Sequence, residues 1–174
     1  MNFKLLAIVL VSVIVGFIIF YSQNVYLSSS TCYEGDVKPI FSPYSSEEMF
    51  KLIKNAKYEI KLEVYEFSSK ALADALIIAR DQGVSIKVIL EPSVYQNNNI
   101  FNYLLNNGID VSWASKKFHN THSKFMIVDD SIVLVGSMNW SENAMKSNRE
   151  ASVIIYSKEI SKEFEKIFDM DFVG

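Results

Sequence analysis

The hydrophobic pattern of residues 37–113 changes period several times, and this limits the folds that the chain can adopt. Residues 58–67 alternate between apolar and charged side chains, which predicts a β-strand with one drier face. Residues 70–82 place leucine and alanine at helical spacing and end at a glycine, which predicts a helix. Three further strands and two helices are expected: strands at 37–41, 84–90 and 109–113, and helices near 46–55 and 95–107. This order is typical of an α/β domain with helices on the faces of a sheet.

The second half of the chain adds more strands. Residues 123–128 and 132–135 are apolar and are separated by Asp-Asp-Ser, which is a turn signal. We therefore consider a hairpin of these two strands. A serine at 141 can cap a short helix, and residues 151–156 and 158–170 predict a strand and a final amphipathic helix.

Composition sets wider bounds on function. The chain has 174 residues, of which 49% are hydrophobic and 21% charged, so one packed domain with a short appendage is expected. Its net charge of -3 lowers the expectation of a nucleic-acid binder, although a local basic cluster can still attract a polyanion. Cys32 is the single cysteine, and the two histidines are His119 and His122. No residue completes a transition-metal shell around them, so we expect a reaction without metal or cofactor.

The N-terminus carries a separate signal. Residues 5–21 are almost wholly apolar, so segment 1–21 is interpreted as a hydrophobic helix, either a signal peptide or a transmembrane anchor. The run spans about 25 Å as a helix, and no clear cleavage site follows it, which favours an uncleaved anchor. Lys4 precedes the run, so the catalytic domain is expected outside the cytoplasm, or secreted or periplasmic if the segment is cleaved. Residues 22–36 then form a linker and 37–174 the folded domain.

Four polar residues around the two apolar strands carry the chemistry. His122 and Lys124 are two residues apart, so on a strand their side chains share a face. Ser137 and Asn139 show the same spacing just after the next strand, and a hairpin would bring all four together. A neutral imidazole can attack phosphorus, while an ammonium and an amide can hold its oxygens. The leaving oxygen needs a second acid, which a symmetric dimer would supply.

These residues resemble the signature of the phospholipase D superfamily. The pattern His122-x-Lys124-x4-Asp129, followed after six residues by Gly-Ser-Met-Asn with Ser137 and Asn139, is similar to that signature in spacing and residue type. Other segments also resemble the domain: residues 65–68, 71–80, 83–90 and 148–150. The resemblance covers roughly residues 40–155 and is strongest to the small endonucleases with one such motif and to their membrane-anchored mitochondrial relatives.

The resemblance implies a fold and an assembly for residues 37–174. It implies an α/β/α sandwich with a mixed sheet, in which two protomers build one active site. It also implies that His122 of one protomer is the nucleophile and that the partner's His122 is the general acid. No divalent metal is expected from this family, and the single cysteine excludes the zinc site inserted in some mitochondrial relatives.

The resemblance also assigns the remaining residues. Lys124 and Asn139 are expected to bind the substrate phosphate, with Ser137 beside them. Glu150 is expected to orient an imidazole through the ring nitrogen that does not attack. Asp129 belongs to the motif and is counted with the catalytic residues, although the family suggests a structural role for it rather than a chemical one.

Three functions remain open at this stage. The first is a metal-independent endonuclease that cleaves DNA or RNA through a covalent phosphohistidine, and the second is a phospholipase D acting on membrane phospholipids. The third, a polyanion-binding module without activity, ranks last. Four basic residues near the motif are either solvated or form a rim that attracts phosphates: Lys116, Lys117, Lys146 and Arg149. Phe118 and Trp140 either stack on bases or pack within the protein, and His119 is expected to be structural or peripheral.

Overall fold

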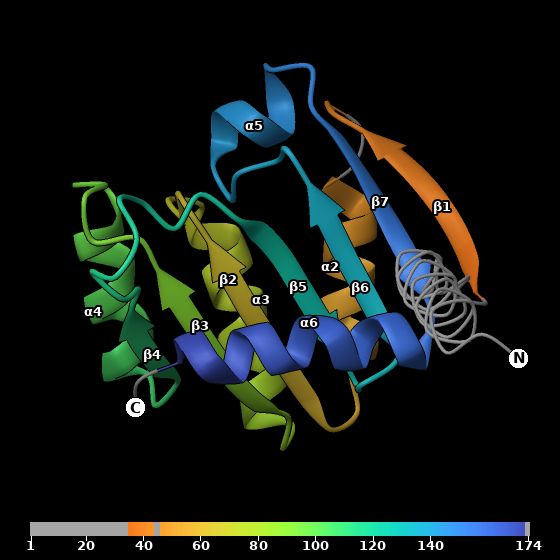
Figure 1. Cartoon of the computed structure of the whole chain (residues 1–174). Coiled ribbons are helices and arrows are strands. Elements are labelled where there is room, and N and C mark those ends of the chain that lie inside the picture. The colour runs from red at the N-terminus through yellow and green to blue at the C-terminus, as the bar shows by residue number, and fades with distance from the viewer. Residues whose placement is uncertain (1–34, 44–45, 173–174) are drawn as a thin grey trace, which may run out of the picture. The chain divides into compact units, whose positions relative to one another are not determined.

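One mixed sheet lies at the centre of the folded part of the chain (Figure 1). The computed structural model describes residues 35–43 and 46–172; the predicted N-terminal helix, and all but the end of the predicted linker, lie outside these residues. The described residues form seven strands in the order β1-β7-β6-β5-β2-β3-β4. Their bounds are β1 Asp36–Phe41, β2 Glu59–Val64, β3 Ser85–Leu90, β4 Asp110–Trp113, β5 Lys124–Val128, β6 Ile132–Gly136 and β7 Ala151–Tyr156.

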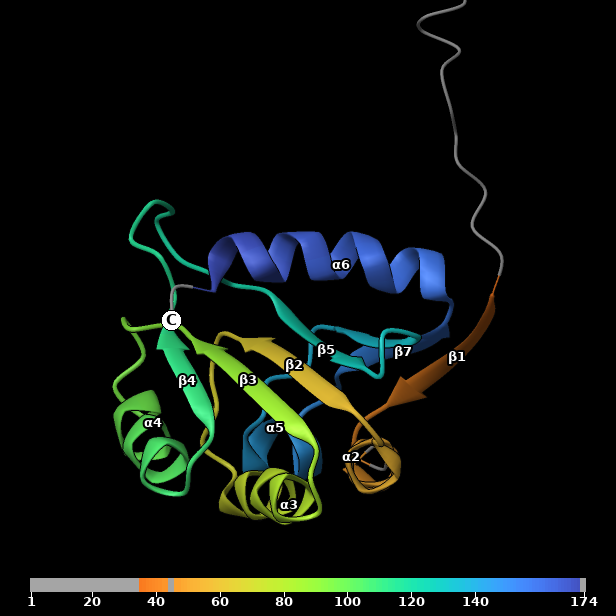
Figure 2. The ribbon, with the colours of Figure 1, turned by 90° about the horizontal axis from the view of Figure 1, so that it is seen from below.

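Helices cover both faces of this sheet. The described helices are α2 Ser46–Asn55, α3 Lys70–Asp81, α4 Asn97–Asn106, α5 Glu142–Lys146 and α6 Lys158–Asp171. Figure 2 shows α2, α3 and α4 on one side of the sheet and α6 on the other. β2, β3 and β4 are parallel, whereas every other neighbouring pair is antiparallel. The predicted α/β/α sandwich with a mixed sheet is therefore confirmed.

The central strand β2 explains how the sheet is buried on both sides. Ile60, Leu62 and Val64 alternate along it and are fully buried among the residues of the main core. Lys61 and Glu63 point to the opposite face and are also buried. The lysine is paired there, because its Nζ lies 3.1 Å from a carboxylate oxygen of Asp169 on α6. Asp169 of α6 and Glu59 of β2 thus compensate the buried charge of Lys61, while Glu63 accepts a hydrogen bond from the Ser123 hydroxyl.

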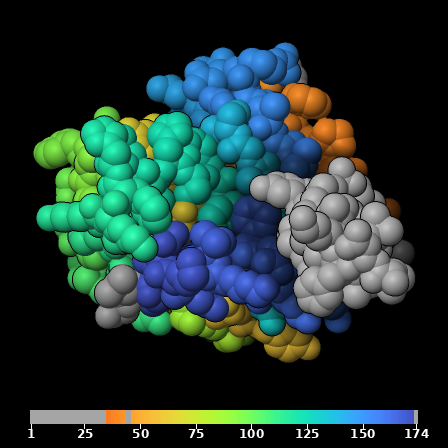
Figure 3. Space-filling model, in the orientation of Figure 1, coloured from red at the N-terminus to blue at the C-terminus, as the bar shows by residue number. Residues whose placement is uncertain are grey.

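α6 covers its face of the sheet through a smaller aromatic and aliphatic cluster. Phe125 of β5 packs edge-to-face on Phe164 and Phe168 of α6, with ring centroids 5.1 and 6.4 Å apart. Ile127 and Val133 complete the buried set from β5 and β6. Figure 3 looks onto this face and shows α6 in blue beside the teal segment that joins β4 to β5.

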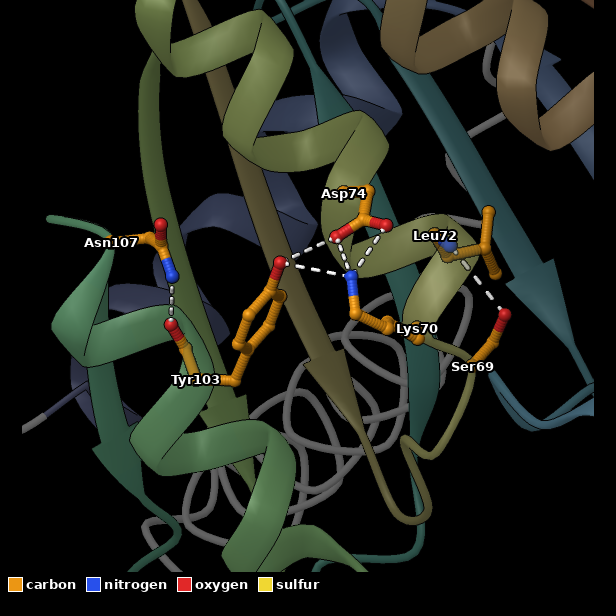
Figure 4. Close-up of polar contacts among 6 residues, drawn as sticks. All are labelled: Ser69, Lys70, Leu72, Asp74, Tyr103 and Asn107. Atoms are coloured by element: carbon orange, nitrogen blue, oxygen red, sulfur yellow. Dashed lines mark hydrogen bonds and ion pairs between the residues drawn. The ribbon is translucent and has the colours of Figure 1, made fainter.

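The N-terminal end of α3 is fixed by polar contacts on the opposite side of the molecule (Figure 4). Ser69 caps α3, because its hydroxyl accepts a hydrogen bond from the backbone N–H of Leu72. Lys70 Nζ lies 2.8 Å from the Asp74 carboxylate, which also accepts a hydrogen bond from the Tyr103 hydroxyl at 2.7 Å. These bonds join α3 to α4, and the Lys70 ammonium is the main reason that the pKa of Asp74 is lowered.

β5 and β6 form the hairpin considered from the sequence. Phe125 pairs with Val135 and Val128 with Ile132. The connection between them is residues 129–131, and φ is positive at both Asp129 and Asp130, 51° and 52°, as at the two central residues of the turns that suit a right-twisted hairpin. Aspartate is one of the few residues other than glycine that adopt this conformation readily, so the turn sequence fixes the register.

The strand predicted at 58–67 is shorter in the structure and ends at Val64. Beyond Tyr65 the chain leaves the sheet because its backbone bonds to the segment after β6: the N–H of Trp140 donates to Glu66, and the N–H of Ser68 donates to Trp140. Trp140 is 2% exposed and packs on Phe67, so it is a core residue and not a base-stacking surface. Within the described ranges no helix has the length and apolar character needed to cross a bilayer.

Candidate active site

The polar residues singled out in the sequence gather at one edge of the sheet. β2 ends at this edge and β5 begins there, since Lys124 pairs with Val64. β6 ends and β7 begins at the same edge, where Gly136 pairs with Ser152. It is the upper edge in Figure 1, next to α5. The ends of four central strands therefore meet there, which is where open α/β sheets usually bind ligands.

His122 and Lys124 lie together at this edge. The Lys124 ammonium is 3.2 Å from His122 Nδ1 and also donates to the carbonyl oxygen of His122 at 2.7 Å. The two nitrogens lie within hydrogen-bonding distance, and the role of Nδ1 in this contact depends on the tautomer of the ring. The Tyr65 ring lies against the imidazole, with centroids 4.3 Å apart, and limits how it can turn. An imidazole beside a cation is a pair suited to attack on a phosphodiester.

Lys124 is a buried cation with few compensating contacts. Its side chain extends beneath an exposed His122, and the residue as a whole is 8% exposed. Burial lowers the pKa of Lys124, while the negative charges of Glu150 and Glu66 act to raise it. The structure gives this ammonium no direct ion pair with either carboxylate. An anionic oxygen bound at this edge would relieve the poor solvation of the ammonium.

Ser137 and Glu150 form a second pair at the edge. The Ser137 hydroxyl donates to Glu150 Oε2 at 2.5 Å, and Asn148 Nδ2 donates to Oε1 at 3.0 Å. The backbone N–H of Glu150 is also fixed, since it donates to the Ser42 hydroxyl at 2.7 Å. Glu150 is therefore well held, but its recorded partners do not include the imidazole. Its expected role in orienting an imidazole stays a prediction, and within one chain its negative charge acts to raise the pKa of Lys124.

Asn139 reaches the site from the segment after β6. Its Nδ2 donates to Glu66 Oε2 at 3.3 Å, and its Oδ1 is buried without a hydrogen-bond partner among the described residues. A buried amide with an unsatisfied atom costs stability, and such groups are often found where a ligand binds. Asn139 thus carries an unsatisfied acceptor beside Glu66, and its expected role in phosphate binding stays a prediction.

Two residues of the site had no assigned role in the sequence analysis: Tyr65 and Glu66. Tyr65 contacts His122, and its ring centroid is 5.2 Å from Lys124 Nζ. Glu66 contacts Asn139 and adds negative charge near the ammonium. Both immediately follow β2, and polar residues directly after a buried strand are a signal that could have found them.

Asp129 is not brought to this edge. It follows the last residue of β5, about 16 Å along the strand from Lys124. Its carboxylate accepts hydrogen bonds from the backbone N–H groups of Lys57, Tyr58 and Glu59, at 2.8, 2.7 and 3.1 Å. The structure thus removes Asp129 from the group of reacting residues and gives it the task of fixing the start of β2 to the hairpin turn.

No group of three or more His, Cys, Asp or Glu side chains in the described part of the chain could hold a metal ion. The family model described as "Cardiolipin synthase, PLD-like domain" matches residues 49–172, which include the whole site. The chain belongs to the phospholipase D superfamily.

Individual members of the superfamily are similar over most of the domain. The phospholipase D family member Nuc from Salmonella typhimurium superposes with a TM-score of 0.74 and 26% identity, covering 79% of this chain and 94% of Nuc. The mitochondrial cardiolipin hydrolase of Mus musculus is 29% identical over 139 residues, 75% of this chain. A cardiolipin synthase of Clostridium perfringens is 30% identical over 129 residues, 70% of this chain. The matches span 62% and 27% of these two relatives.

The family, the fold and the site agree on a reaction class. Four residues of the superfamily pattern, His122, Lys124, Ser137 and Asn139, lie at one edge of a superfamily fold. These features support a phosphodiesterase activity for the chain. Its relatives include proteins named for cardiolipin as well as Nuc, so the family leaves both kinds of diester open.

Proposed function

We propose that the chain is a metal-independent endonuclease that cleaves DNA or RNA through a covalent phosphohistidine at His122. The observation that carries this proposal is the contact of the imidazole with a buried ammonium, 3.2 Å between Lys124 Nζ and His122 Nδ1, at an open edge of the sheet. The pair supplies a nucleophile and a counter-charge for the non-bridging oxygens.

In the first step an unprotonated ring nitrogen of His122 attacks phosphorus. A P–N bond forms, the P–O bond to the leaving nucleoside oxygen breaks, and that oxygen must receive a proton. Lys124 and Asn139 hold the non-bridging oxygens during this step. In the second step water attacks phosphorus and loses a proton, the P–N bond breaks, and His122 is restored.

The first step also needs a proton donor. The second histidine, His119, belongs to the loop before the motif. In the described part of the chain it makes no hydrogen bond with His122. We assign the role of general acid to the partner's His122 in a homodimer with a shared site. The same imidazole, after losing its proton, can accept one from water, so the two steps balance.

The shared site has a direct test. Wild-type protein is mixed with His122→Ala protein under conditions that exchange protomers, at constant total concentration. If a site needs histidines from both chains, activity falls as the square of the wild-type fraction, to about one quarter in an equal mixture. A linear fall, to about one half, contradicts the shared site.

We propose nucleic acid as the preferred substrate because of the size of the chain and its proposed shared site. The match covers 94% of Nuc at 26% identity but 27% of the cardiolipin synthase, so this chain corresponds to a small member with one motif. Such a member must place its site at a surface between two protomers, and an open surface accepts a long strand.

The test uses the full chain in detergent, with single- and double-stranded DNA and RNA in the presence of a chelator. We expect cleavage that resists the chelator and is abolished by His122→Ala. Lys162→Ala, an exposed substitution on α6, serves as the control that retains activity. Absence of cleavage, or cleavage that survives His122→Ala, would contradict the proposal.

A phospholipase D activity is the alternative, and two observations favour it. Relatives are named mitochondrial cardiolipin hydrolase and cardiolipin synthase, and residues 5–21 form an apolar segment that would hold the site near lipid headgroups. Vesicles containing cardiolipin or phosphatidylcholine separate the two functions. Headgroup release without nucleic-acid cleavage would support the alternative, and inert vesicles beside active cleavage would exclude it.

The location proposed for the enzyme follows from the same segment. We propose that residues 1–21 anchor the chain in a membrane and that the catalytic domain faces away from the cytoplasm, since Lys4 precedes the apolar run. Cleavage of the segment would release a secreted or periplasmic enzyme. The N-terminal sequence of the protein recovered from cells tests this proposal, since an intact Met1 or Asn2 indicates an anchor.

A further inference from the structure

A basic loop lies directly before the catalytic motif and is not used by the mechanism above. It consists of residues 115–118, Ser-Lys-Lys-Phe, and joins β4 to β5 together with the residues that follow it. The segment between the two strands projects on the side of the sheet that carries α6 (Figure 2). The loop borders a cavity of about 630 Å³ whose other wall is formed by Glu91, Pro92 and Ser93.

The base of this loop is held firmly against the domain. The backbone N–H of Thr121 donates to Glu91 Oε2 at 2.7 Å, and the backbone N–H of Ser93 donates to Oε1 at 3.0 Å. The Ser93 hydroxyl bonds to Asn120 Oδ1 at 3.2 Å. Thr121 is next to His122, so these bonds also set the position of the loop relative to the nucleophile.

Glu91, the acidic residue of the cavity, accepts hydrogen bonds with both of its carboxylate oxygens. Glu91 is 4% exposed, so it presents little charge to solvent. Burial acts to raise the pKa of Glu91, but the hydrogen bonds from Ser93 and Thr121 outweigh it and lower the pKa. The carboxylate therefore stays ionised and occupied, and the accessible charge of the cavity comes from lysines.

The exposed part of the loop offers two cations and one aromatic ring. Lys116 and Lys117 are exposed, and neither forms an ion pair with any residue in the described ranges. Phe118 is 51% exposed, and the Lys117 ammonium lies 5.9 Å from its ring centroid. Unpaired cations beside an exposed ring suit a single strand, which presents phosphates and stackable bases.

We propose that the basic loop is a subsite for single-stranded nucleic acid, in which Lys116 and Lys117 bind phosphates that flank the scissile one and Phe118 stacks on a base. The proposal rests on the nuclease function proposed above. Phe118 is four residues from His122, so the two lie within about 14 Å along the chain. The subsite thus contacts nucleotides within a few positions of the cleavage point.

Three variants test the subsite: Lys116→Ala/Lys117→Ala, Phe118→Ala, and the matched double variant Lys158→Ala/Lys162→Ala on α6. All are made in the His122→Ala background, in which binding of a fluorescent single-stranded 20-mer is measured without turnover. The salt dependence of log Kd is recorded for each. The α6 double variant removes the same charge from exposed positions outside the sheet edge that holds the site.

We expect the loop double variant to reduce the slope of log Kd against log salt by about 1.4, since each phosphate contact on a single strand contributes about 0.7. We expect Phe118→Ala to weaken binding about 5- to 150-fold, the range for loss of one base stack. The α6 double variant should leave the slope unchanged. Equal slopes for the two double variants would overturn the proposal, and so would a Phe118→Ala variant that binds like its parent.

Two more measurements separate this inference from the proposed function. With active protein, the ratio of kcat/KM for the 20-mer to kcat/KM for bis(p-nitrophenyl) phosphate should fall in the loop variants. If wild-type protein cleaves the small diester but no oligonucleotide, the nuclease proposal fails, while the binding data still decide the subsite. If the loop variants lose binding to vesicles of anionic phospholipid and keep oligonucleotide binding, the loop is a membrane contact and the subsite is rejected.

Discussion

The two ends of β5 hold residues of one sequence motif but have opposite surroundings. At its beginning, Lys124 and the exposed His122 lie at an open edge, and Lys124 has no direct ion pair with a carboxylate. At its end, the Asp129 carboxylate accepts hydrogen bonds from three backbone N–H groups at and just before the start of β2. A short motif can thus combine a reactive end, where groups await a substrate, with a closed end that holds the strand in register.

The difference predicts that substitutions at the two ends will affect different properties. Residues at the open end should control the reaction with little effect on folding, because their polar groups are not used by the fold. Residues at the closed end should control stability, because removal of Asp129 leaves three backbone donors without their acceptor.

The largest effect is expected at the open end. His122→Ala should lower kcat by about 10³-fold or more, because it removes the nucleophile, and should leave the Tm nearly unchanged because the side chain is exposed. Steady-state kinetics and thermal unfolding on the same preparation measure both. A variant that keeps a tenth of the activity would refute the role of His122.

The next largest effect is expected at the closed end. Asp129→Ala should destabilise the protein by about 2–4 kcal/mol, because three bonds to a charged acceptor are lost and alanine is strained at a positive φ. Asp129→Asn tolerates this φ and separates the charge from the strain. Urea unfolding gives the free energies.

The same variant distinguishes structure from chemistry. Below its unfolding transition, Asp129→Asn should retain most of the wild-type kcat per folded molecule. A collapse of kcat at unchanged stability would return Asp129 to the catalytic group and would remove the contrast between the two ends of the strand.

A smaller effect concerns the alkaline limit of the reaction. Burial lowers the pKa of Lys124, and the charges of Glu150 and Glu66 act to raise it, in that order of size. The cationic form is needed for phosphate binding, so Glu150→Gln should lower this pKa further and move the alkaline limb of the kcat/KM profile to lower pH. Glu66→Gln should shift it in the same direction by less. A shift of the alkaline limb to higher pH in these variants would mean that this limb reflects the ionisation of a group other than Lys124.

The smallest effect lies at the closed end, on α6. Burial and the neighbouring Asp130 raise the pKa of Glu165 from 4.5 to about 7. The fold therefore favours the protonated form of Glu165. The contribution of this form to the free energy of unfolding is fully present below pH 4.5 and is lost as pH rises through about 7. Glu165→Gln should raise the Tm at pH 8 relative to wild type and not at pH 4, with kcat unchanged. Equal Tm differences at both values of pH would exclude this linkage.

The fold could be predicted largely because its elements are local. The alternation in β2, the caps of α3 and α6, and the two aspartates of the hairpin turn each specify their own segment. The position of His122 beside Lys124 followed from the two-residue period of a strand. These features need no knowledge of distant contacts.

The unpredicted features depend on residues that are distant in sequence. Asp129 is bonded to amides about 70 residues earlier, and Asn139 contacts Glu66 across a similar separation. Trp140 proved to be a core residue because it pairs with the backbone around Phe67. No local pattern specifies such contacts, since they arise only when the sheet is assembled.

The most direct test of the central claim is capture of the covalent intermediate. Protein and a single-stranded oligonucleotide are mixed and denatured at alkaline pH within one turnover, and the peptides are mapped by mass spectrometry. The account predicts a nucleotide adduct joined through phosphorus to the peptide that contains His122, absent from His122→Ala protein. An adduct on another residue, or turnover at the normal rate with no adduct, would contradict it.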